Sequence, residues 1–160
     1  MEAHDAAIAP DRCGAPWASV EGIRIPVSLS HSGGWAAAAA HLRTRVGIDV
    51  EPAQEIPPHF ARYFLWPDEI PGLAGWEDPP TALLAAWTVK EAVLKATGRG
   101  LSVPPSTVRI RRIDAHGRAS VTLDGAEVAA ASWREEGAVV AVACAGRSDL
   151  PALSVSSGAM

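Results

Sequence analysis

The most regular alternation of hydrophobic and polar residues lies in the run RVGIDVEP, residues 45–52. Because successive side chains of a strand point to opposite faces, this run predicts a short strand with one apolar face and one acidic face. Asp49 and Glu51 are two residues apart, so both carboxylates belong to the acidic face. Pro52 ends the predicted strand.

Strand-like runs lie on both sides of this one. IPVSLSHSGG (25–34) predicts a strand that ends in a polar turn. Beyond Pro104 and Pro105 the strand-like runs are STVRIRRI, RASVTLDG with AEVAAASW, and GAVVAVACA. The segments DAHG (114–117) and LDGAE (123–127) supply hairpin turns. The segment WAAAAAHL (35–42) is ambiguous, because five alanines favour a helix but the neighbouring turn and strand favour a strand.

The longest helical pattern covers about residues 81–97, and Gly98 is well placed to end it. Upstream, IPPHFARYFLWPDEI (56–70) predicts a helix entered through prolines, with a new turn at Pro67. The apolar stripe of the long helix consists of Leu83, Trp87 and Leu94. Lys90 falls inside this stripe, where an unpaired charge would be unfavourable.

Composition draws attention to the same helix. Only two of the 14 basic residues are lysines, Lys90 and Lys95, and both lie in it. Arginine presents a planar fork of donors and lysine a compact, mobile charge, so the two are not interchangeable at a site. In a chain that otherwise uses arginine, the two lysines indicate positions where the kind of cation matters.

Length and charge exclude several classes of protein. The 160 residues fit one domain with a real core, and the net charge of -4 argues against a general nucleic-acid-binding protein. Cys13 and Cys144 are too few and too far apart for a disulfide framework or a metal knuckle. No long apolar run predicts a membrane span, and the opening MEAHDAAIAPDR lacks the apolar core of a signal peptide. We therefore expect a cytoplasmic protein.

The long helix gives the two carboxylates of the acidic strand a possible role. Glu91 is a candidate third ligand for a divalent cation such as Mg²⁺, which prefers a few carboxylates completed by water and phosphate oxygens. Lys95 follows Glu91 by about one helical turn and could neutralise phosphate charge. Together these residues predict a metal-and-lysine site for a diphosphate. A solvated strand face and an ordinary helix surface pair would explain the same residues, and both explanations stay open at this point.

Three motifs together resemble a known family. SLSHSGGW, VGIDVE and WTVKEAVLKATGRGL, followed by a Val-Arg-Ile strand, resemble the ordered motif set of surfactin-type 4′-phosphopantetheinyl transferases. The resemblance runs from about residue 14 to residue 146, and the order and spacings fit throughout.

The resemblance implies an α+β fold in one domain, residues 1–146, with coenzyme A bound between two related halves. The first α/β half (1–45) is truncated, and the second half (46–146) is complete, with the long helix packed on an antiparallel sheet. The resemblance also implies that WAAAAAHL is a strand. Residues 147–160 are expected to form a flexible tail.

The resemblance also implies roles for individual residues. The family's magnesium-ligand positions are occupied by Asp49, Glu51 and Glu91. His31 and Ser32 stand where a Ser-His pair contacts coenzyme A phosphates, and Lys95 matches the lysine at the coenzyme A diphosphate. Lys90 matches the lysine before the acid of the helix motif.

The implied reaction is Mg²⁺-dependent transfer of 4′-phosphopantetheine from coenzyme A to a serine of an apo acyl or peptidyl carrier protein, releasing 3′,5′-ADP. Glu91, or a water on the metal, would accept the serine proton, and Lys95 would assist the departing phosphate. The region 53–76, with Phe60, Phe64 and Trp66, is the expected carrier-docking surface, and plain helix packing is the alternative there.

The match with the family is incomplete before the SHS motif. Gly14-Ala15-Pro16 stands for a motif whose middle residue is normally a cation, so Arg12, Arg24 or Arg43 would have to replace its charge. Asp68 stands where the family usually has glutamate. These departures leave alternatives: a non-catalytic member that binds coenzyme A or a carrier protein, or a domain natively fused to a megasynthase. They also predict a homo-oligomer, or association with a synthase, in which a neighbour supplies cations.

Overall fold

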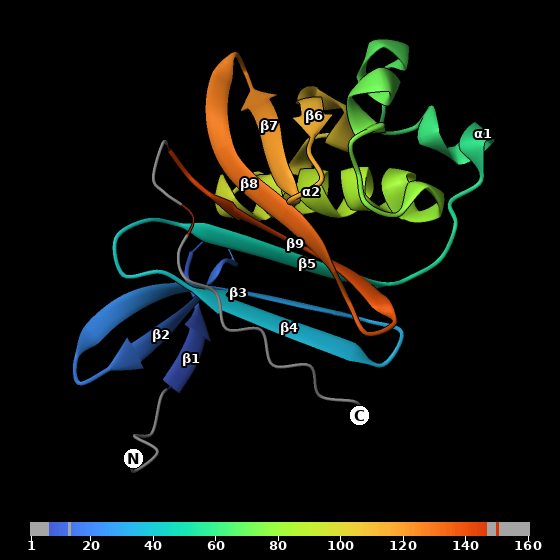
Figure 1. Ribbon diagram of the computed structural model, residues 1–160. Coiled ribbons are helices and arrows are strands. Elements are labelled where there is room, and N and C mark those ends of the chain that lie inside the picture. Colours follow the sequence, from blue (N-terminus) through green and yellow to red (C-terminus); the bar gives the residue numbers. More distant parts are fainter. Residues whose placement is uncertain (1–6, 13, 147–149, 151–160) are drawn as a thin grey trace.

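The computed structural model describes residues 7–12, 14–146 and 150, which form two antiparallel sheets and one long helix (Figure 1). The first sheet has the order β1-β2-β3-β4, with strands β1 (Ala7–Pro10), β2 (Pro16–Val20), β3 (Ile23–Ser32) and β4 (Trp35–Ala40). The second sheet has the order β5-β9-β8-β7-β6, with strands β5 (Val46–Pro52), β6 (Val108–Ile113), β7 (Arg118–Leu123), β8 (Ala126–Glu135) and β9 (Ala138–Cys144). The helices are α1 (Pro58–Ala61) and α2 (Ala82–Ala96). The predicted α+β fold is confirmed, whereas nearly all of the expected flexible tail lies outside the described residues.

The alanine run forms a strand, as the family resemblance implies. β3 and β4 are joined by Gly33 and Gly34, whose φ angles of 53° and 86° suit a two-residue hairpin turn. Ala37 and Ala39 are buried against the second sheet, and Ala38 between them is exposed on the other side. Strand pairing and this burial outweigh the preference of alanine for helices.

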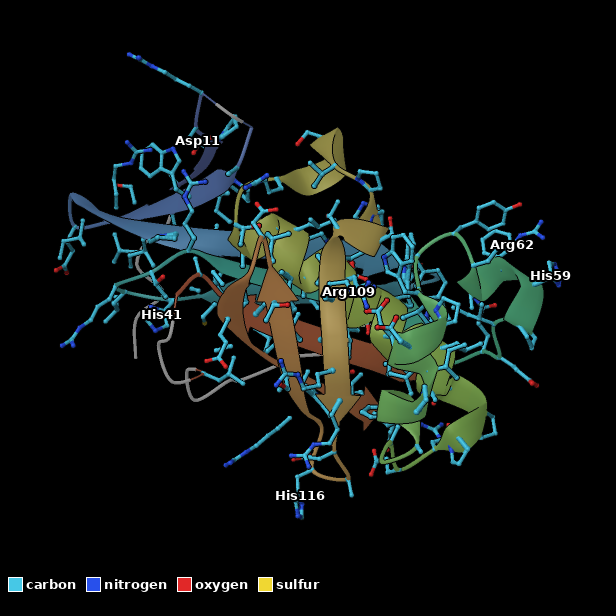
Figure 2. The ribbon with its side chains drawn as sticks, turned by 90° about the horizontal axis from the view of Figure 1, so that it is seen from above. Asp11, His41, His59, Arg62, Arg109 and His116 are labelled. Atoms are coloured by element: carbon cyan, nitrogen blue, oxygen red, sulfur yellow. The ribbon has the colours of Figure 1, made fainter. Side chains whose placement is uncertain are left out.

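The predicted hairpins of the second half are also confirmed. β7 and β8 are joined through Asp124 and Gly125, both with positive φ angles, 51° and 79°. Between β6 and β7, the Asp114 carboxylate accepts hydrogen bonds from the backbone N–H groups of His116 and Arg118. Figure 2 shows His116 at the tip of this hairpin.

The β5–β9 pair lies between two hydrophobic clusters. One cluster, with Val89 and Ala141, fills the space between α2 and the second sheet. The other, with Ile48, Val142 and Ala39, joins the two sheets. Since side chains alternate along β5, its apolar residues face the first sheet and its acidic residues face α2.

Small residues bring α2 close to β5. A Cβ atom added to Gly47 would lie 2.0 Å from the carbonyl oxygen of Ala92, so only glycine allows this approach. The helix ends before Gly98, whose φ of 70° fits the predicted C′ position. The predicted apolar stripe does not match the buried surface of α2. Leu83 and Trp87 are only partly buried, whereas residues around most of the circumference of the helix are buried.

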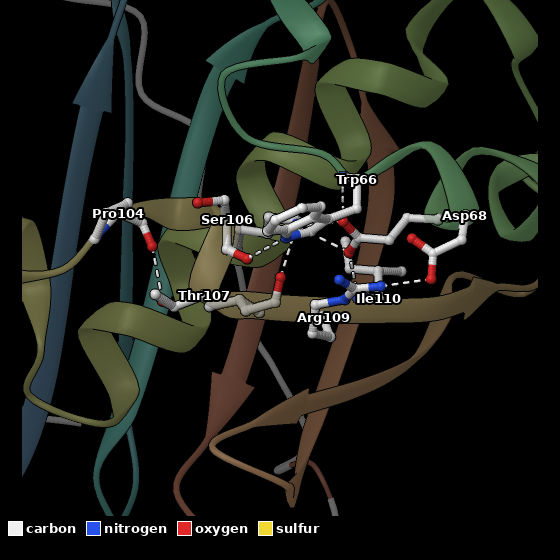
Figure 3. A network of polar contacts seen from close by, with 10 residues as sticks. Trp66, Asp68, Pro104, Ser106, Thr107, Arg109 and Ile110 are labelled. Carbon is white, nitrogen blue, oxygen red and sulfur yellow. Dashed lines mark hydrogen bonds and ion pairs between the residues drawn. The ribbon is translucent and has the colours of Figure 1, made fainter.

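Lys90 is fully buried and ties α2 to the segment before it. Its Nζ donates hydrogen bonds to Oε1 and Oε2 of Glu69, at 2.9 and 3.1 Å, and to the carbonyl oxygen of Val108, at 2.6 Å. The same carboxylate accepts the backbone N–H groups of Trp66 and Ile110 (Figure 3). Burial lowers the pKa of Lys90, and the hydrogen bonds with Glu69 act in the opposite direction. All three donors of the ammonium group are thus paired.

The buried carboxylate is Glu69, whereas Asp68, which stands where the family usually has glutamate, lies on the surface. Asp68 is exposed, and its Oδ2 lies 2.6 Å from Nη2 of Arg109 (Figure 3). Both acids belong to the 3₁₀ helix Pro67–Leu73. Because successive side chains of such a helix differ by about a third of a turn, only one of the two can face the core.

Residues 7–26, for which the sequence predicts little, form β1, β2 and the start of β3. Within the described residues before α1, the chain contains strands and no helix. Across the described ranges, no helix is long and apolar enough to cross a membrane.

Candidate active site

The predicted carboxylates of β5 and the charged residues of α2 meet where the helix lies over the strand. Asp49 faces α2 and is 6% exposed. Nζ of Lys95 lies 2.7 Å from Oδ1 of Asp49 and 2.9 Å from the carbonyl oxygen of Ile48. Lys95 therefore reaches Asp49, one of the metal-ligand candidates of the strand.

Several negative charges share this region. Burial raises the pKa of Glu91 above its ordinary 4.5, the charge of Asp49 raises it further, Lys95 lowers it, and Glu51 raises it. Burial also raises the pKa of Asp49, against the opposing effects of Lys95 and Ser30. Three carboxylates thus lie near one lysine, and an additional cation would favour their ionised forms.

Two oxygens of this cluster, Oδ2 of Asp49 and Oε1 of Glu91, are buried and have no hydrogen-bond partner. Buried polar atoms are nearly always paired, so unpaired carboxylate oxygens suggest a place for a ligand. In the part of the chain that the structure describes, no three His, Cys, Asp or Glu side chains are arranged to hold a metal ion as they stand. The donor type nevertheless fits a hard cation, and Asp49, Glu51 and Glu91 are the residues that could hold Mg²⁺.

A row of serines on β3 covers the edge of β5. Ser28, Ser30 and Ser32 alternate with outward-facing residues and lie on the side of β3 that faces β5. Oγ of Ser28 accepts the N–H of Ile48 at 3.0 Å, and Oγ of Ser30 accepts the N–H of Val50 at 3.3 Å. The serine hydroxyls therefore occupy backbone donors of an edge strand that would otherwise need another strand or water.

Two serines of this row also bind the acidic side chains. Ser30 donates its hydroxyl to Oδ1 of Asp49 at 2.9 Å. Ser32 donates to Oε2 of Glu51 at 2.5 Å. Asp49 is thereby held through one oxygen, by Lys95 and Ser30 together, while its other oxygen stays unpaired.

A cavity of about 470 Å³ opens beside Lys95. Its charged and aromatic lining comprises Asp11, Trp17, Arg24, Arg45 and Lys95. The guanidinium of Arg24 lies over the ring of Trp17, 3.9 Å from its centroid. Nη2 of Arg45 lies 3.6 Å from Oδ2 of Asp11, which Figure 2 shows beside the strands of the first sheet. Lys95 lines the cavity and also binds Asp49, so this side chain connects the cavity with the carboxylates, which are not themselves in the cavity lining.

Only one of the arginines proposed to replace the missing motif cation lines this cavity. Arg24 does, together with Ala15, where the family motif carries a cation. Arg12 lines an adjoining hollow, and Arg43 belongs to neither of these two linings. Arg45 lines both and was not anticipated from the sequence.

A family model described as the 4′-phosphopantetheinyl transferase superfamily matches residues 45–144, which is more than half of the chain. The chain belongs to this superfamily. Its members are transferases of the 4′-phosphopantetheinyl type, which use coenzyme A and act on carrier proteins. Among the curated proteins, none matches this chain. The matched region contains β5, α2 and the remaining strands of the second sheet.

The structure separates the two residues that the phosphopantetheinyl transferase resemblance places at the coenzyme A phosphates. Ser32 faces β5 and binds Glu51. His31 is exposed on the opposite face of β3 and is not in the cavity lining. Adjacent residues of a strand point to opposite faces, so both cannot meet the carboxylates of β5.

Sequence reasoning missed Ser30 and Arg45 as parts of this site. A signal for Ser30 was present, since VSLSHS places a serine at every second position of a predicted strand. Arg45 carries no comparable signal, because its position next to the cavity follows only from how the chain enters β5.

Proposed function

We propose that the protein transfers 4′-phosphopantetheine from coenzyme A to a serine of an apo acyl or peptidyl carrier protein, with Mg²⁺ held by Asp49, Glu51 and Glu91. The observation that carries this proposal is the pair of buried, unpartnered carboxylate oxygens near Lys95, which itself lines a cavity together with two arginines. The fit of the donor set to a hard cation supports the metal, and the basic cavity supports a polyphosphate ligand.

In the proposed reaction, the carrier serine oxygen forms a bond to the β-phosphorus of coenzyme A. The bond between that phosphorus and the bridging oxygen breaks, and 3′,5′-ADP leaves with the bonding electrons. Bound Mg²⁺ would supply stabilisation for the negative charge that develops on the diphosphate. Glu91 accepts the proton of the serine hydroxyl. Lys95 places its ammonium group against the departing phosphate, where a compact, mobile charge can follow the displaced oxygen.

The cavity beside Lys95 is the proposed place of the remainder of coenzyme A. Arg24 and Arg45 would bind the phosphate remote from the diphosphate, replacing the cation that Ala15 does not provide. Because both arginines belong to this chain, their position favours a site completed by the chain's own cations over one completed by the cations of a neighbouring subunit. The expected homo-oligomer or synthase association stays a prediction, as does the cytoplasmic location.

The proposed carrier-docking surface consists of three exposed aromatic residues and one isoleucine, called the aromatic patch here: Phe60, Tyr63, Trp66 and Ile70. Each of these residues is at least 50% exposed, whereas Phe64, which was expected to take part, is 1% exposed and packs on Trp87. The guanidinium groups of Arg62 and Arg109 lie over the rings of Tyr63 and Trp66, and Asp68 offsets the charge of Arg109, so the positive charge beside the patch comes from Arg62. Large exposed apolar residues beside cations suit a carrier with an acidic, partly apolar surface.

Replacing Phe60 and Tyr63 by serine should raise the KM for the carrier protein and leave the affinity for coenzyme A unchanged. The exposed Leu42, replaced by serine, is a control outside the aromatic patch. An unchanged KM for the carrier protein in the double variant would contradict this docking surface.

The proposed activity is tested by incubating the protein with coenzyme A, Mg²⁺ and a panel of apo carrier proteins, and by measuring the intact mass of each carrier. We expect one carrier to gain the mass of phosphopantetheine, and no gain with Asp49→Asn. The alternative, a non-catalytic module, predicts coenzyme A or carrier binding by calorimetry without any gain in mass. We further propose that residues 1–45 and 46–146 form the two halves of one transferase domain.

A further inference from the structure

The geometry points to Ser30 and Ser32 as positioning residues for the metal ligands, acting through Asp49 and Glu51. This inference rests on the proposed function, because it concerns the same carboxylates. Under this inference, the two serines of the SHS motif orient the proposed metal ligands, in place of the contact with coenzyme A phosphates that the resemblance implies for the motif. The serines lie before the region that the superfamily model matches, and the carboxylates lie within it.

Each serine holds one oxygen of one carboxylate. Ser30 binds Oδ1 of Asp49, and Oδ2 of the same group remains buried and unpaired. Ser32 binds Oε2 of Glu51, so one oxygen of this carboxylate is also engaged. A carboxylate held through one oxygen has its orientation fixed and keeps the other oxygen for a cation. Both serines also come from a paired strand, whose backbone limits their movement.

The serine row contains its own control. Ser28 lies on the same face of β3 and accepts the N–H of Ile48, but it contacts no carboxylate. Ser30 accepts the N–H of Val50 in addition to binding Asp49, so Ser28→Ala reproduces only the backbone part of Ser30→Ala. Ser32 makes no such backbone contact, so Ser32→Ala tests the carboxylate part alone.

The test measures Mn²⁺ binding to the protein without coenzyme A, by electron paramagnetic resonance, together with the melting temperature of each variant. Removing a hydrogen-bond partner of a metal ligand typically weakens metal binding by about tenfold or more. We expect a loss of about this size in Ser30→Ala and in Ser32→Ala. We expect Ser30→Thr and Ser32→Thr, which keep the hydroxyl, to restore the affinity.

Ser28→Ala should lower the melting temperature and leave the Mn²⁺ affinity within about twofold of the wild type, because Ser28 holds backbone only. If Ser30→Ala does not fold, Ser32→Ala and its threonine counterpart decide the matter. Wild-type affinity in Ser30→Ala and Ser32→Ala, or an equal loss in Ser28→Ala, would overturn the inference and leave the proposed function standing. A wild type that binds no Mn²⁺ would overturn both.

Discussion

Lys90 and Glu69 form a completely buried ion pair between α2 and the 3₁₀ helix before it, with Nζ 2.9 Å from Oε1. Removing two charges from water offsets most of their attraction, so such a pair adds little net stability. Breaking it is different, because the remaining charge stays buried without a partner. The pair therefore specifies where the segment before α2 packs.

Lys90→Arg should lower the free energy of unfolding by about 1–3 kcal/mol, because a longer, planar group must enter a closely filled space. Lys90→Met should cost about 3–5 kcal/mol, since it leaves the buried charge of Glu69 without a counter-ion. Urea denaturation followed by circular dichroism measures both. A wild-type free energy of unfolding in Lys90→Met would show that the pair does not constrain the fold.

Lys95→Arg should instead impair turnover, by roughly tenfold or more, because a fork replaces a mobile charge beside the diphosphate. Its stability should stay close to that of the wild type, as the side chain of Lys95 is 29% exposed. Lys90→Arg is the matched control, an identical replacement on the same helix. If both variants equal the wild type in turnover and in unfolding, the confinement of lysine to α2 has no functional meaning.

Glu91→Gln should abolish transfer and raise the melting temperature of the metal-free protein at neutral pH. Burial and the charge of Asp49 raise the pKa of Glu91 above 4.5, so the folded state keeps this proton to a higher pH than the unfolded state does. The metal-free wild type should therefore lose stability as the pH rises from 4.5 through the raised pKa.

Calorimetric scans at several pH values, with and without Mg²⁺, measure this effect. Glu91→Gln should show a weaker loss with rising pH, and Glu77→Gln is a control acid away from the site. If the melting temperature of Glu91→Gln falls with rising pH as steeply as that of the wild type, the raised pKa of Glu91 is not the cause of the loss of stability.

Arg24→Gln and Arg45→Gln should each weaken coenzyme A binding by about tenfold, the usual scale for losing a hydrogen bond to a charged group. The loss should disappear with dephospho-coenzyme A, which lacks the remote phosphate. Arg43→Gln, outside both hollows, should bind both ligands as the wild type does. Calorimetry without carrier protein makes the comparison, and an equal loss for both ligands would place the arginines elsewhere on the ligand.

Much of the site was predictable because its signals are local. The alternation in RVGIDVEP placed Asp49 and Glu51 on one face, and the helical spacing in α2 placed Glu91 and Lys95 one turn apart. Gly98 occupies the C′ position that the helix pattern predicts, because its left-handed backbone favours glycine. The close approach of α2 to Gly47 was not predicted and is seen only in the structure.

The sequence by itself determined β3, the strands of the second sheet, the long helix and the charged residues that face one another across β5 and α2. Tertiary structure alone decided which alternate face of β3 meets β5, and hence that the serines bind the carboxylates while His31 points away. It also decided that Glu69 and not Asp68 enters the core, and that Arg45 reaches the cavity. Each of these depends on contacts between residues distant in sequence, which periodicity and propensity do not encode.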